Sequence, residues 1–248
     1  MRRVLPEPRS DWAYFLDLDG TLLEFVDHPS PVRDERRLRA LLAGLHRATG
    51  GAVAVVSGRA LADVDKLLGH DGPRLPAAGQ HGIERRDARG HVTHHPFAAG
   101  RLERAREQLA TAVAERPGLV LEDKGASLAL HYRRAPQLGG YAHRLVRGLV
   151  PKLGSRFRIQ AGKCVVELKP AGRDKGAAVT EFMREPPFRG RAAVFIGDDV
   201  ADEHGFTTVN RMGGLSIKVG PGRTAARWRL RDVAAVWKWL ESGWGAVL

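Results

Sequence analysis

The sequence has one cysteine, few aromatic residues and no long apolar run. Cys164 has no partner for a disulfide within the chain, and the lack of further cysteines excludes a cysteine-built zinc site. No stretch approaches the roughly 20 apolar residues that cross a bilayer, and residues 1–12 carry arginines and prolines where a secretory signal is apolar. We therefore expect a cytoplasmic protein with no membrane partner.

The remaining composition is that of a folded protein with an excess of positive charge. Of the 248 residues, 43% are hydrophobic and 27% charged, and the formal net charge is +12. This charge suggests an anionic partner: a phosphorylated metabolite, nucleic acid or an acidic surface. Because Lys and Arg are spread along the chain without forming a basic arm, we expect no nucleic-acid partner.

Short apolar runs separated by helical patterns predict an α/β fold. The runs at 14–16, 52–56 and 192–196 each end at polar residues, as buried strands of a parallel sheet do. Such a sheet has helices on both faces and places ligands beyond the carboxyl ends of its strands. Further strands are expected at 75–78 and 215–219, and helices at 35–47, 61–68, 176–183 and after a cap at Asp232.

The middle of the chain has a different pattern, which predicts an inserted α+β domain of order αββαββ. Helices are expected at 102–115 and 138–150, and strands at 119–124, 127–133, 156–160 and 164–169. The domains are therefore a Rossmann-like doubly wound core of residues 1–100 and 171–248, and an insert of residues 101–170. Alternation places apolar side chains on one face of the insert's sheet, under its helices. The opposite face, which suits either a hydroxyl-rich ligand or plain solvation, carries Glu122, Lys124, His131, Arg133, Glu167 and Lys169.

Two acidic clusters follow predicted strands. Asp17 and Asp19 lie two residues apart in extended backbone and therefore point the same way, where a divalent cation would offset their repulsion. Asp198, Asp199 and Asp202 follow another strand, and oxygen-only ligands suit Mg²⁺. Taken singly, Asp-x-Asp-Gly also fits a turn, and the second run also fits a solvated surface.

Two further stretches offer groups for an anion. Ser57 and Gly58 provide a hydroxyl and backbone N–H groups at the start of a helix, although a helix cap is the simpler reading of this stretch alone. Lys175 lies near the start of another helix and can neutralise a nucleophile and a phosphate, or be merely solvated. For His91, His94 and His95 a polar loop is favoured over a metal cluster.

Along the chain these stretches come in the order Asp-x-Asp-Gly-Thr, Ser, Lys and Gly-Asp-Asp, and in this order they resemble the haloacid dehalogenase phosphohydrolase superfamily. Within it, the chain looks like the trehalose-6-phosphate phosphatase family from about residue 12 to residue 228. One departure is Ala201, where the family usually has threonine in Gly-Asp-Asp-x-Thr-Asp-Glu; it affects a local hydrogen bond and leaves the metal site intact. The motifs that carry the resemblance are Phe15-Leu16-Asp17-Leu18-Asp19-Gly20-Thr21-Leu22, Ser57-Gly58-Arg59, Gly79-Gln80-His81-Gly82, Leu121-Glu122-Asp123-Lys124, His131-Tyr132-Arg133, Glu167-Leu168-Lys169-Pro170, Asp174-Lys175-Gly176 and Gly197-Asp198-Asp199.

The resemblance implies a mechanism and a set of roles. Asp17 would be a covalent nucleophile, Asp19 the acid and base, and Lys175, Ser57 and Gly58 would hold the phosphate. The implied metal is Mg²⁺, bound by Asp17, the backbone carbonyl of Asp19 and Asp198. Asp199 and Asp202 would support these ligands without binding the metal themselves. The insert would be a mobile cap that recognises the sugar through Glu122, Lys124 and Glu167, with His81 and Arg133 nearby.

The function implied by the resemblance is hydrolysis of trehalose 6-phosphate, the last step of trehalose biosynthesis, by a monomeric enzyme. The same chemistry on sucrose phosphate or a hexose phosphate is the nearest alternative, because the core motifs do not distinguish one sugar from another. A basic nucleic-acid-binding protein on an inactive phosphatase scaffold is a distant alternative. It predicts binding to DNA or RNA that weakens steeply as salt rises, with no magnesium-dependent phosphatase activity.

Overall fold

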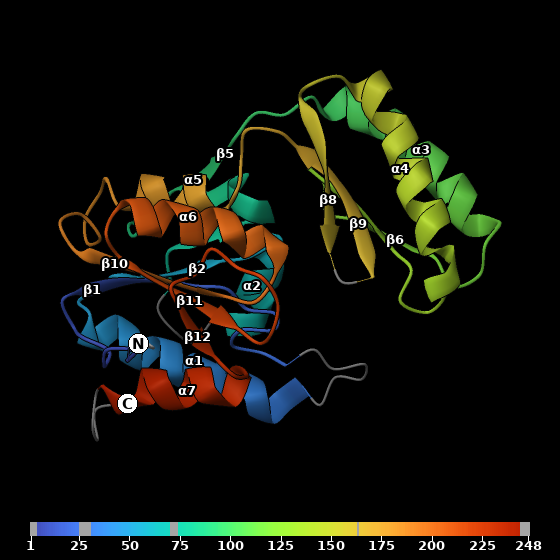
Figure 1. Ribbon diagram of the computed structural model, residues 1–248. Helices are drawn as coiled ribbons and strands as arrows, with labels where there is room; N and C mark the ends of the chain where they lie inside the picture. Colours follow the sequence, from blue (N-terminus) through green and yellow to red (C-terminus); the bar gives the residue numbers. More distant parts are fainter. Residues whose placement is uncertain (1–3, 25–30, 70–73, 163, 244–248) are drawn as a thin grey trace. The chain divides into compact units, whose positions relative to one another are not determined.

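A computed structural model describes residues 4–24, 31–69, 74–162 and 164–243, and the chain divides into two compact units (Figure 1). The first, which we call the core unit, comprises Met1–His94 and Asp174–Leu248. The second, which we call the inserted unit, is His95–Arg173. Among the described helices, none has both the length and the apolar composition needed to span a bilayer.

The core unit is built on an eight-stranded sheet of order β12-β11-β10-β1-β2-β3-β4-β5. The neighbours from β12 to β3 are parallel, whereas β4 and β5 pair antiparallel at one edge. The strands are β1 (Trp12–Leu16), β2 (Val53–Val56), β3 (Ala77–Gly79), β4 (Glu84–Arg86), β5 (Val92–His94), β10 (Ala192–Gly197), β11 (Leu215–Val219) and β12 (Trp228–Leu230).

Helices cover both faces of this sheet, as expected for a doubly wound fold. Successive residues of β1 point to opposite faces, so that Tyr14 packs in one core and Phe15 in the other. Burial of each such side chain contributes roughly 1.5–3 kcal/mol to folding. One face is covered by α1 (Pro31–Ala48), α2 (Leu61–Leu68) and α7 (Val233–Ser242), and the other by α5 (Lys175–Phe182) and α6 (Glu203–Arg211), with α1 and α7 opposite α5 and α6 in Figure 1.

One expectation about this unit was wrong: His94 lies in β5, where a polar loop was expected. The sheet also carries an antiparallel hairpin of β4 and β5 at one edge, which the sequence did not predict. The hairpin gives no apolar signal, since Arg85 and Arg86 in β4 are buried by pairing with acids: Arg85 with Glu185, and Arg86 with Asp65 at 2.8 Å. Strand β12 and helix α6 were not predicted either.

The inserted unit has the expected αββαββ order. Its four strands form an antiparallel sheet of order β6-β7-β9-β8. The elements are α3 (Ala99–Ala114), β6 (Val120–Asp123), β7 (Leu128–His131), α4 (Gly139–Leu153), β8 (Phe157–Gly162) and β9 (Val165–Pro170).

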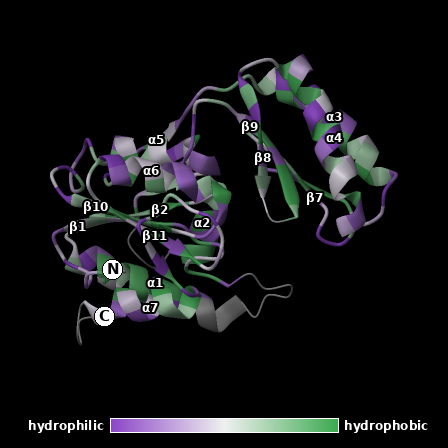
Figure 2. Cartoon of the chain, in the orientation of Figure 1, coloured by the Kyte–Doolittle hydropathy of each residue, from purple (hydrophilic) through white to green (hydrophobic). Residues whose placement is uncertain are grey.

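The two faces of this second sheet differ in polarity, as the alternation predicts. Leu128 pairs with Leu168, and Leu130 with Val166, and all four are fully buried in one cluster with residues of α3 and α4. Both helices mix apolar and polar residues along their length (Figure 2), consistent with one face on the core and one in solvent. The helices therefore leave the opposite face of the sheet to its polar side chains.

Candidate active site

Three adjacent strands of the core sheet deliver polar groups to the same edge. Asp17 follows β1, Ser57 follows β2 and Asp198 follows β10, and these strands are neighbours in the order β10-β1-β2. Because they run parallel, their carboxyl ends lie together. Backbone hydrogen bonds continue past the strands, from Asp17 N to the Ile196 carbonyl at 3.1 Å and from Ser57 N to the Ala78 carbonyl at 2.9 Å.

Lys175 joins the two acidic clusters. Its Nζ lies 2.7 Å from Oδ1 of Asp17 and 2.6 Å from Oδ1 of Asp202, and all three residues are almost completely buried. Helix α5 carries the lysine, and Asp174 caps this helix by accepting a hydrogen bond from Ala177 N at 2.9 Å. Burial lowers the pKa of Lys175, but the charges of Asp17 and Asp202 outweigh it, so the net shift is upward and the lysine stays cationic.

The buried acids outnumber this lysine, which makes the cluster fit a divalent metal. Carboxylate oxygens of Asp17, Asp198 and Asp202 all lie within 4.8 Å of one another. Burial, then the charge of Asp202, raise the pKa of Asp17 well above its ordinary value, and the same two causes raise the pKa of Asp198 to about 7. Among the described residues, Asp198 Oδ1 is buried without a hydrogen-bond partner. A cation at this point would relieve the repulsion and bond this oxygen.

Asp202 supports the other residues of this cluster, because both of its carboxylate oxygens already have hydrogen-bond partners within the protein. Besides binding Lys175, it accepts hydrogen bonds from the backbone N–H groups of Asp198 and Asp199 through Oδ2, both at 2.9 Å. Asp199 begins a short 3-10 helix in a capping box with Asp202. Lys218, which sequence reasoning missed, donates from β11 to the carbonyl of Asp198 and to that of Val219 at 2.9 Å. These bonds hold the Asp198 loop in place.

The residues expected to hold phosphate lie on the other side of Asp17. Ser57 is buried at the end of β2, and Gly58 follows it. His81 has a left-handed backbone (φ 58°), donates its N–H to the Ser57 carbonyl at 3.0 Å, and packs on Gly58. A Cβ added at Gly58 would lie 3.0 Å from Cε1 of His81, so a larger residue here would press on the His81 ring.

The carboxylate of Asp19 does not join the acidic cluster. It is bound instead by the guanidinium of Arg59, with Nε to Oδ2 at 2.8 Å and Nη2 to Oδ1 at 2.6 Å. Asp17 and Asp19 therefore each have a cationic partner of their own. The Ser-Gly-Arg motif contains Arg59, but nothing in the sequence indicated that it pairs with an acid 40 residues away.

The inserted unit brings three of the predicted recognition residues together on the polar face of its sheet. Lys124 Nζ lies 3.9 Å from Oε2 of Glu122 and 3.7 Å from Oε1 of Glu167. Glu167 also accepts from Ser127 Oγ at 2.7 Å, and Glu122 is 2.8 Å from Nε2 of His131, a hydrogen bond that lowers the pKa of Glu122. Arg133, in contrast, is exposed in the turn after β7.

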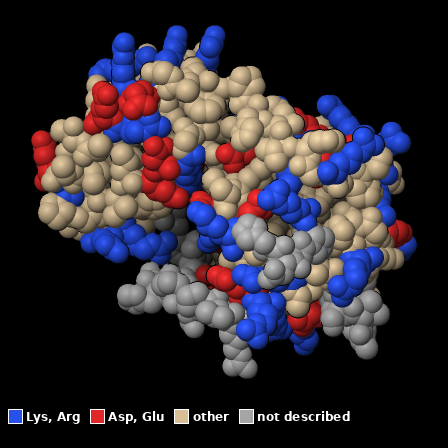
Figure 3. All heavy atoms as spheres, turned by 180° about the vertical axis from the view of Figure 1, so that it is seen from behind, with Lys and Arg blue, Asp and Glu red and all other residues tan. Residues whose placement is uncertain are grey.

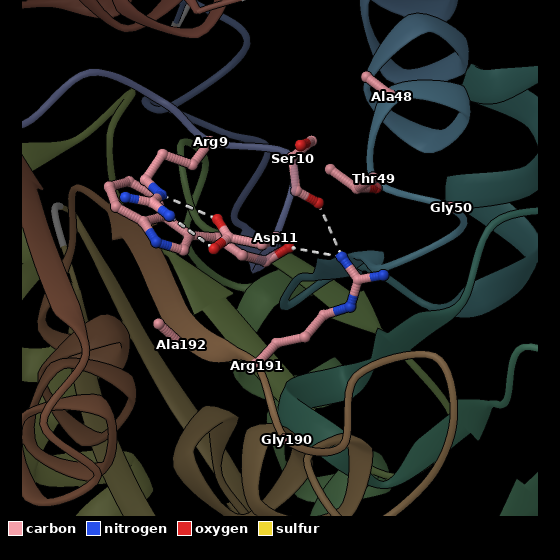
Figure 4. Close-up of a pocket in the computed structure, with 10 residues that line it drawn as sticks. Arg9, Ser10, Asp11, Ala48, Thr49, Gly50, Gly190, Arg191 and Ala192 are labelled. Carbon is pink, nitrogen blue, oxygen red and sulfur yellow. Dashed lines mark hydrogen bonds and ion pairs between the residues drawn. The ribbon is translucent and has the colours of Figure 1, made fainter.

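Outside this site, the face drawn in Figure 3 carries charges of both signs. Lys and Arg are scattered over the face in Figure 3 with Asp and Glu between them. A hollow at the opposite end of β1 and β10 (Figure 4) contains Arg9, which pairs with Asp11 at 2.7 Å, and Arg191, which donates to the Ser10 carbonyl at 2.8 Å. Arg191 therefore ties the loop before β10 to the residues before β1, whereas the Arg9–Asp11 pair lies within the latter.

The doubly wound sheet, with polar residues at the carboxyl ends of its central strands, has the fold of the haloacid dehalogenase class. The fold agrees with a haloacid dehalogenase-like hydrolase from Bacteroides thetaiotaomicron (TM-score 0.67, 15% identity, 92% of this chain and 93% of that one). It agrees further with the C-terminal domain of trehalose-6-phosphate phosphatase from Candida albicans (TM-score 0.82, 22% identity, 95% and 92% covered).

Sequence comparison narrows the class to a family. The family model for trehalose-phosphatase matches residues 15–234. The trehalose-6-phosphate phosphatase of Escherichia coli is 46% identical over 238 residues, which cover 95% of this chain and 88% of that protein. The chain belongs to the trehalose-phosphatase family.

Proposed function

We propose that this protein hydrolyses trehalose 6-phosphate to trehalose and inorganic phosphate in the cytoplasm. The observation that carries the proposal is the buried contact of Lys175 with Asp17 beside Asp198 and Asp202, in a chain of this family. A carboxylate held by a lysine at the end of a central strand is suited to attack phosphorus. The substrate is supported by the name of the E. coli relative, and the cytoplasmic location by the single cysteine.

In the first half of the proposed reaction, a carboxylate oxygen of Asp17 attacks phosphorus as the bond from phosphorus to the sugar oxygen breaks. Asp19 gives its proton to that oxygen, so the sugar leaves as an alcohol. In the second half, Asp19 takes a proton from water, whose oxygen attacks phosphorus while the bond to Asp17 breaks. Inorganic phosphate leaves, and both carboxyl groups return to their starting states.

The other core residues bind and orient the phosphoryl group. Lys175 partly neutralises Asp17 and the phosphate oxygens, and Ser57 and the N–H of Gly58 donate hydrogen bonds to those oxygens. We propose Mg²⁺ as the cation, held by Asp17, the carbonyl of Asp19 and Asp198, because all its ligands are oxygens. When bound, it would neutralise charge on the phosphoryl oxygens. Asp199 and Asp202 keep the loop that carries Asp198 in position.

We assign sugar recognition to the inserted unit, acting as a cap over the core. On one face of its sheet, the Lys124 amine lies within 4 Å of a carboxylate oxygen of Glu122 and of Glu167. This face therefore offers both donors and acceptors for the hydroxyl groups of a sugar. His81 and Arg133 are proposed to complete the sugar site. Closure of such a cap would exclude water from the reacting phosphate.

The test is phosphate release from trehalose 6-phosphate, sucrose phosphate, glucose 6-phosphate and p-nitrophenyl phosphate, with and without chelator and with Mg²⁺ restored. We expect trehalose 6-phosphate to have the highest kcat/KM and the chelator to abolish release. An Asp17→Asn preparation controls for contaminating phosphatases. Preference for another sugar phosphate would reject the substrate, and release that persists in chelator would reject the metal-dependent mechanism.

A further inference from the structure

Two side chains from the turn between β6 and β7 meet the same carboxylate oxygen of Glu167. Ser127 Oγ donates to Oε1 of Glu167 at 2.7 Å, and Lys124 Nζ lies 3.7 Å from that oxygen. A hydrogen bond to a charged carboxylate is strong and directional, and 2.7 Å is its ordinary length, whereas a separation of 3.7 Å gives attraction without fixing a direction. Of these two contacts, the bond from Ser127 is therefore the one that restricts rotation of the Glu167 side chain.

The register of the sheet explains why Glu167 reaches Ser127. Strand β9 pairs with β7, and Ala129 lies directly opposite Glu167. The methyl group of Ala129 cannot bond a carboxylate. Ser127, two residues earlier, points to the same side of the sheet and is the diagonal neighbour of Glu167. Ser127 is 1% exposed and Glu167 is 6% exposed, so water competes little for the bond between them.

The turn that carries Ser127 is held by backbone groups and by Asp123, without the serine hydroxyl. Lys124 N donates to the Ser127 carbonyl at 3.0 Å, and Gly125 N donates to Oδ1 of Asp123 at 2.8 Å. Gly125 has a left-handed backbone (φ 81°), which suits glycine in a two-residue turn. Loss of the hydroxyl therefore leaves these bonds of the turn in place, and Ser127→Ala tests the bond to Glu167.

The second acid on this face, Glu122, is held less firmly. Its Oε2 lies 2.8 Å from Nε2 of His131, at the other end of β7. The side chains of Glu122 and His131 are 48% and 38% exposed, and pairs that water reaches to this extent contribute little. The buried bond from Ser127 is therefore the contact on this face that we expect to orient a recognition residue.

We propose that Ser127 is a positioning residue that determines discrimination between sugar phosphates and other phosphate esters. It holds the Glu167 carboxylate in one orientation for the sugar hydroxyls, and it acts on the substrate only through Glu167. This inference rests on the proposed function, in particular on sugar recognition by the inserted unit. It predicts that loss of the hydroxyl reduces the preference for a sugar phosphate and leaves the phosphatase chemistry intact.

The test compares kcat/KM of Ser127→Ala on trehalose 6-phosphate and on p-nitrophenyl phosphate, which has no sugar hydroxyls. We expect a loss of about tenfold, and at most about 10²-fold, on the sugar phosphate, as when a binding group is misplaced. The loss on the aryl phosphate should be less than about twofold. The readout is the ratio of the two kcat/KM values, because a merely structural defect lowers both together.

Ser216→Ala is the matched control. Ser216, in β11 of the core unit, also has a buried hydroxyl, which donates to Asn210 Oδ1 at 2.7 Å. Both substitutions remove one bonded hydroxyl, so both should lower Tm by a few degrees. Only Ser127→Ala should change the ratio of the two kcat/KM values.

A double mutant separates positioning from direct contact with the substrate. In a Glu167→Ala background, Ser127→Ala should cause no further change in the ratio, because the carboxylate that it orients is already gone. A ratio that Ser127→Ala alone leaves unchanged, or a full additional loss in that background, would overturn the inference.

Failure of the proposed function would give different results. A wild-type enzyme that prefers another sugar phosphate would reject trehalose 6-phosphate as the substrate, and the same comparison on that sugar phosphate then tests Ser127. A Glu167→Ala variant with an unchanged ratio would reject sugar recognition by Glu167, and the role of Ser127 with it.

Discussion

Removal of the divalent cation should destabilise the core unit at high pH much more than at low pH. The cause is the buried acidic cluster: in the metal-free site, burial and then the charge of Asp202 raise the pKa of Asp198 from 3.8 to about 7, and they raise the pKa of Asp17 in the same direction. Between about pH 4 and 7 the folded protein then binds more protons than the unfolded chain, so metal-free stability falls as the pH rises through this window. Below it this penalty is absent, and above pH 7 it is complete.

The size of the effect follows from the same shift. A difference of about three pH units corresponds to at most about 4 kcal/mol, at about 1.4 kcal/mol per unit. A cation that binds the ionised carboxylates offsets this penalty, so its stabilising effect should grow with pH. For a unit of this size, about 4 kcal/mol corresponds to a change in Tm of at most about 15 °C.

The assay is thermal unfolding at pH 5.5, 7 and 8.5, with Mg²⁺ or with chelator. We expect the difference in Tm between the two conditions to be small at pH 5.5 and largest at pH 8.5. Asp198→Asn is the matched control: it removes the group whose pKa is about 7, so the metal-free variant should be more stable than wild type at pH 8.5 and respond more weakly to Mg²⁺. A Tm difference independent of pH, or none at all, would refute the reasoning.

Five other substitutions test different parts of the structure. Asp17→Asn should fold normally but lose phosphate release by several orders of magnitude, and near-normal release would contradict a covalent nucleophile. Glu122→Ala and Glu167→Ala should reduce kcat/KM for sugar phosphates more than for p-nitrophenyl phosphate; equal losses would reject sugar recognition by the inserted unit. Gly205→Ala should lower the free energy of unfolding by about 1–3 kcal/mol, because its Cβ would lie 2.6 Å from a buried aromatic ring, whereas Gly148→Ala, in open space on a helix, should raise it by up to about 1 kcal/mol. A neutral Gly205→Ala in chemical denaturation would show that this packing can relax.

Much of the fold follows from local sequence pattern, because a residue's neighbours along the chain determine which side of an element is apolar. The runs before Asp17 and Ser57 predicted strands β1 and β2, and the switch to an alternating pattern predicted the inserted αββαββ unit. Parallel strands place their carboxyl ends together, so the meeting of Asp17 and Asp198 could also be expected. Alternation likewise placed Glu122, Lys124 and Glu167 on one face.

Only the tertiary structure decided which charges pair. Asp17 and Asp19 are two residues apart and look equivalent in sequence, yet one is bound by Lys175 and the other by Arg59. The same holds for the β4–β5 hairpin, whose buried arginines are stabilised by distant acids and leave no apolar pattern. The physical reason is that hydrophobic periodicity is a local property, whereas an ion pair depends on how loops far apart in the chain are brought together by the packing of the sheet and its helices.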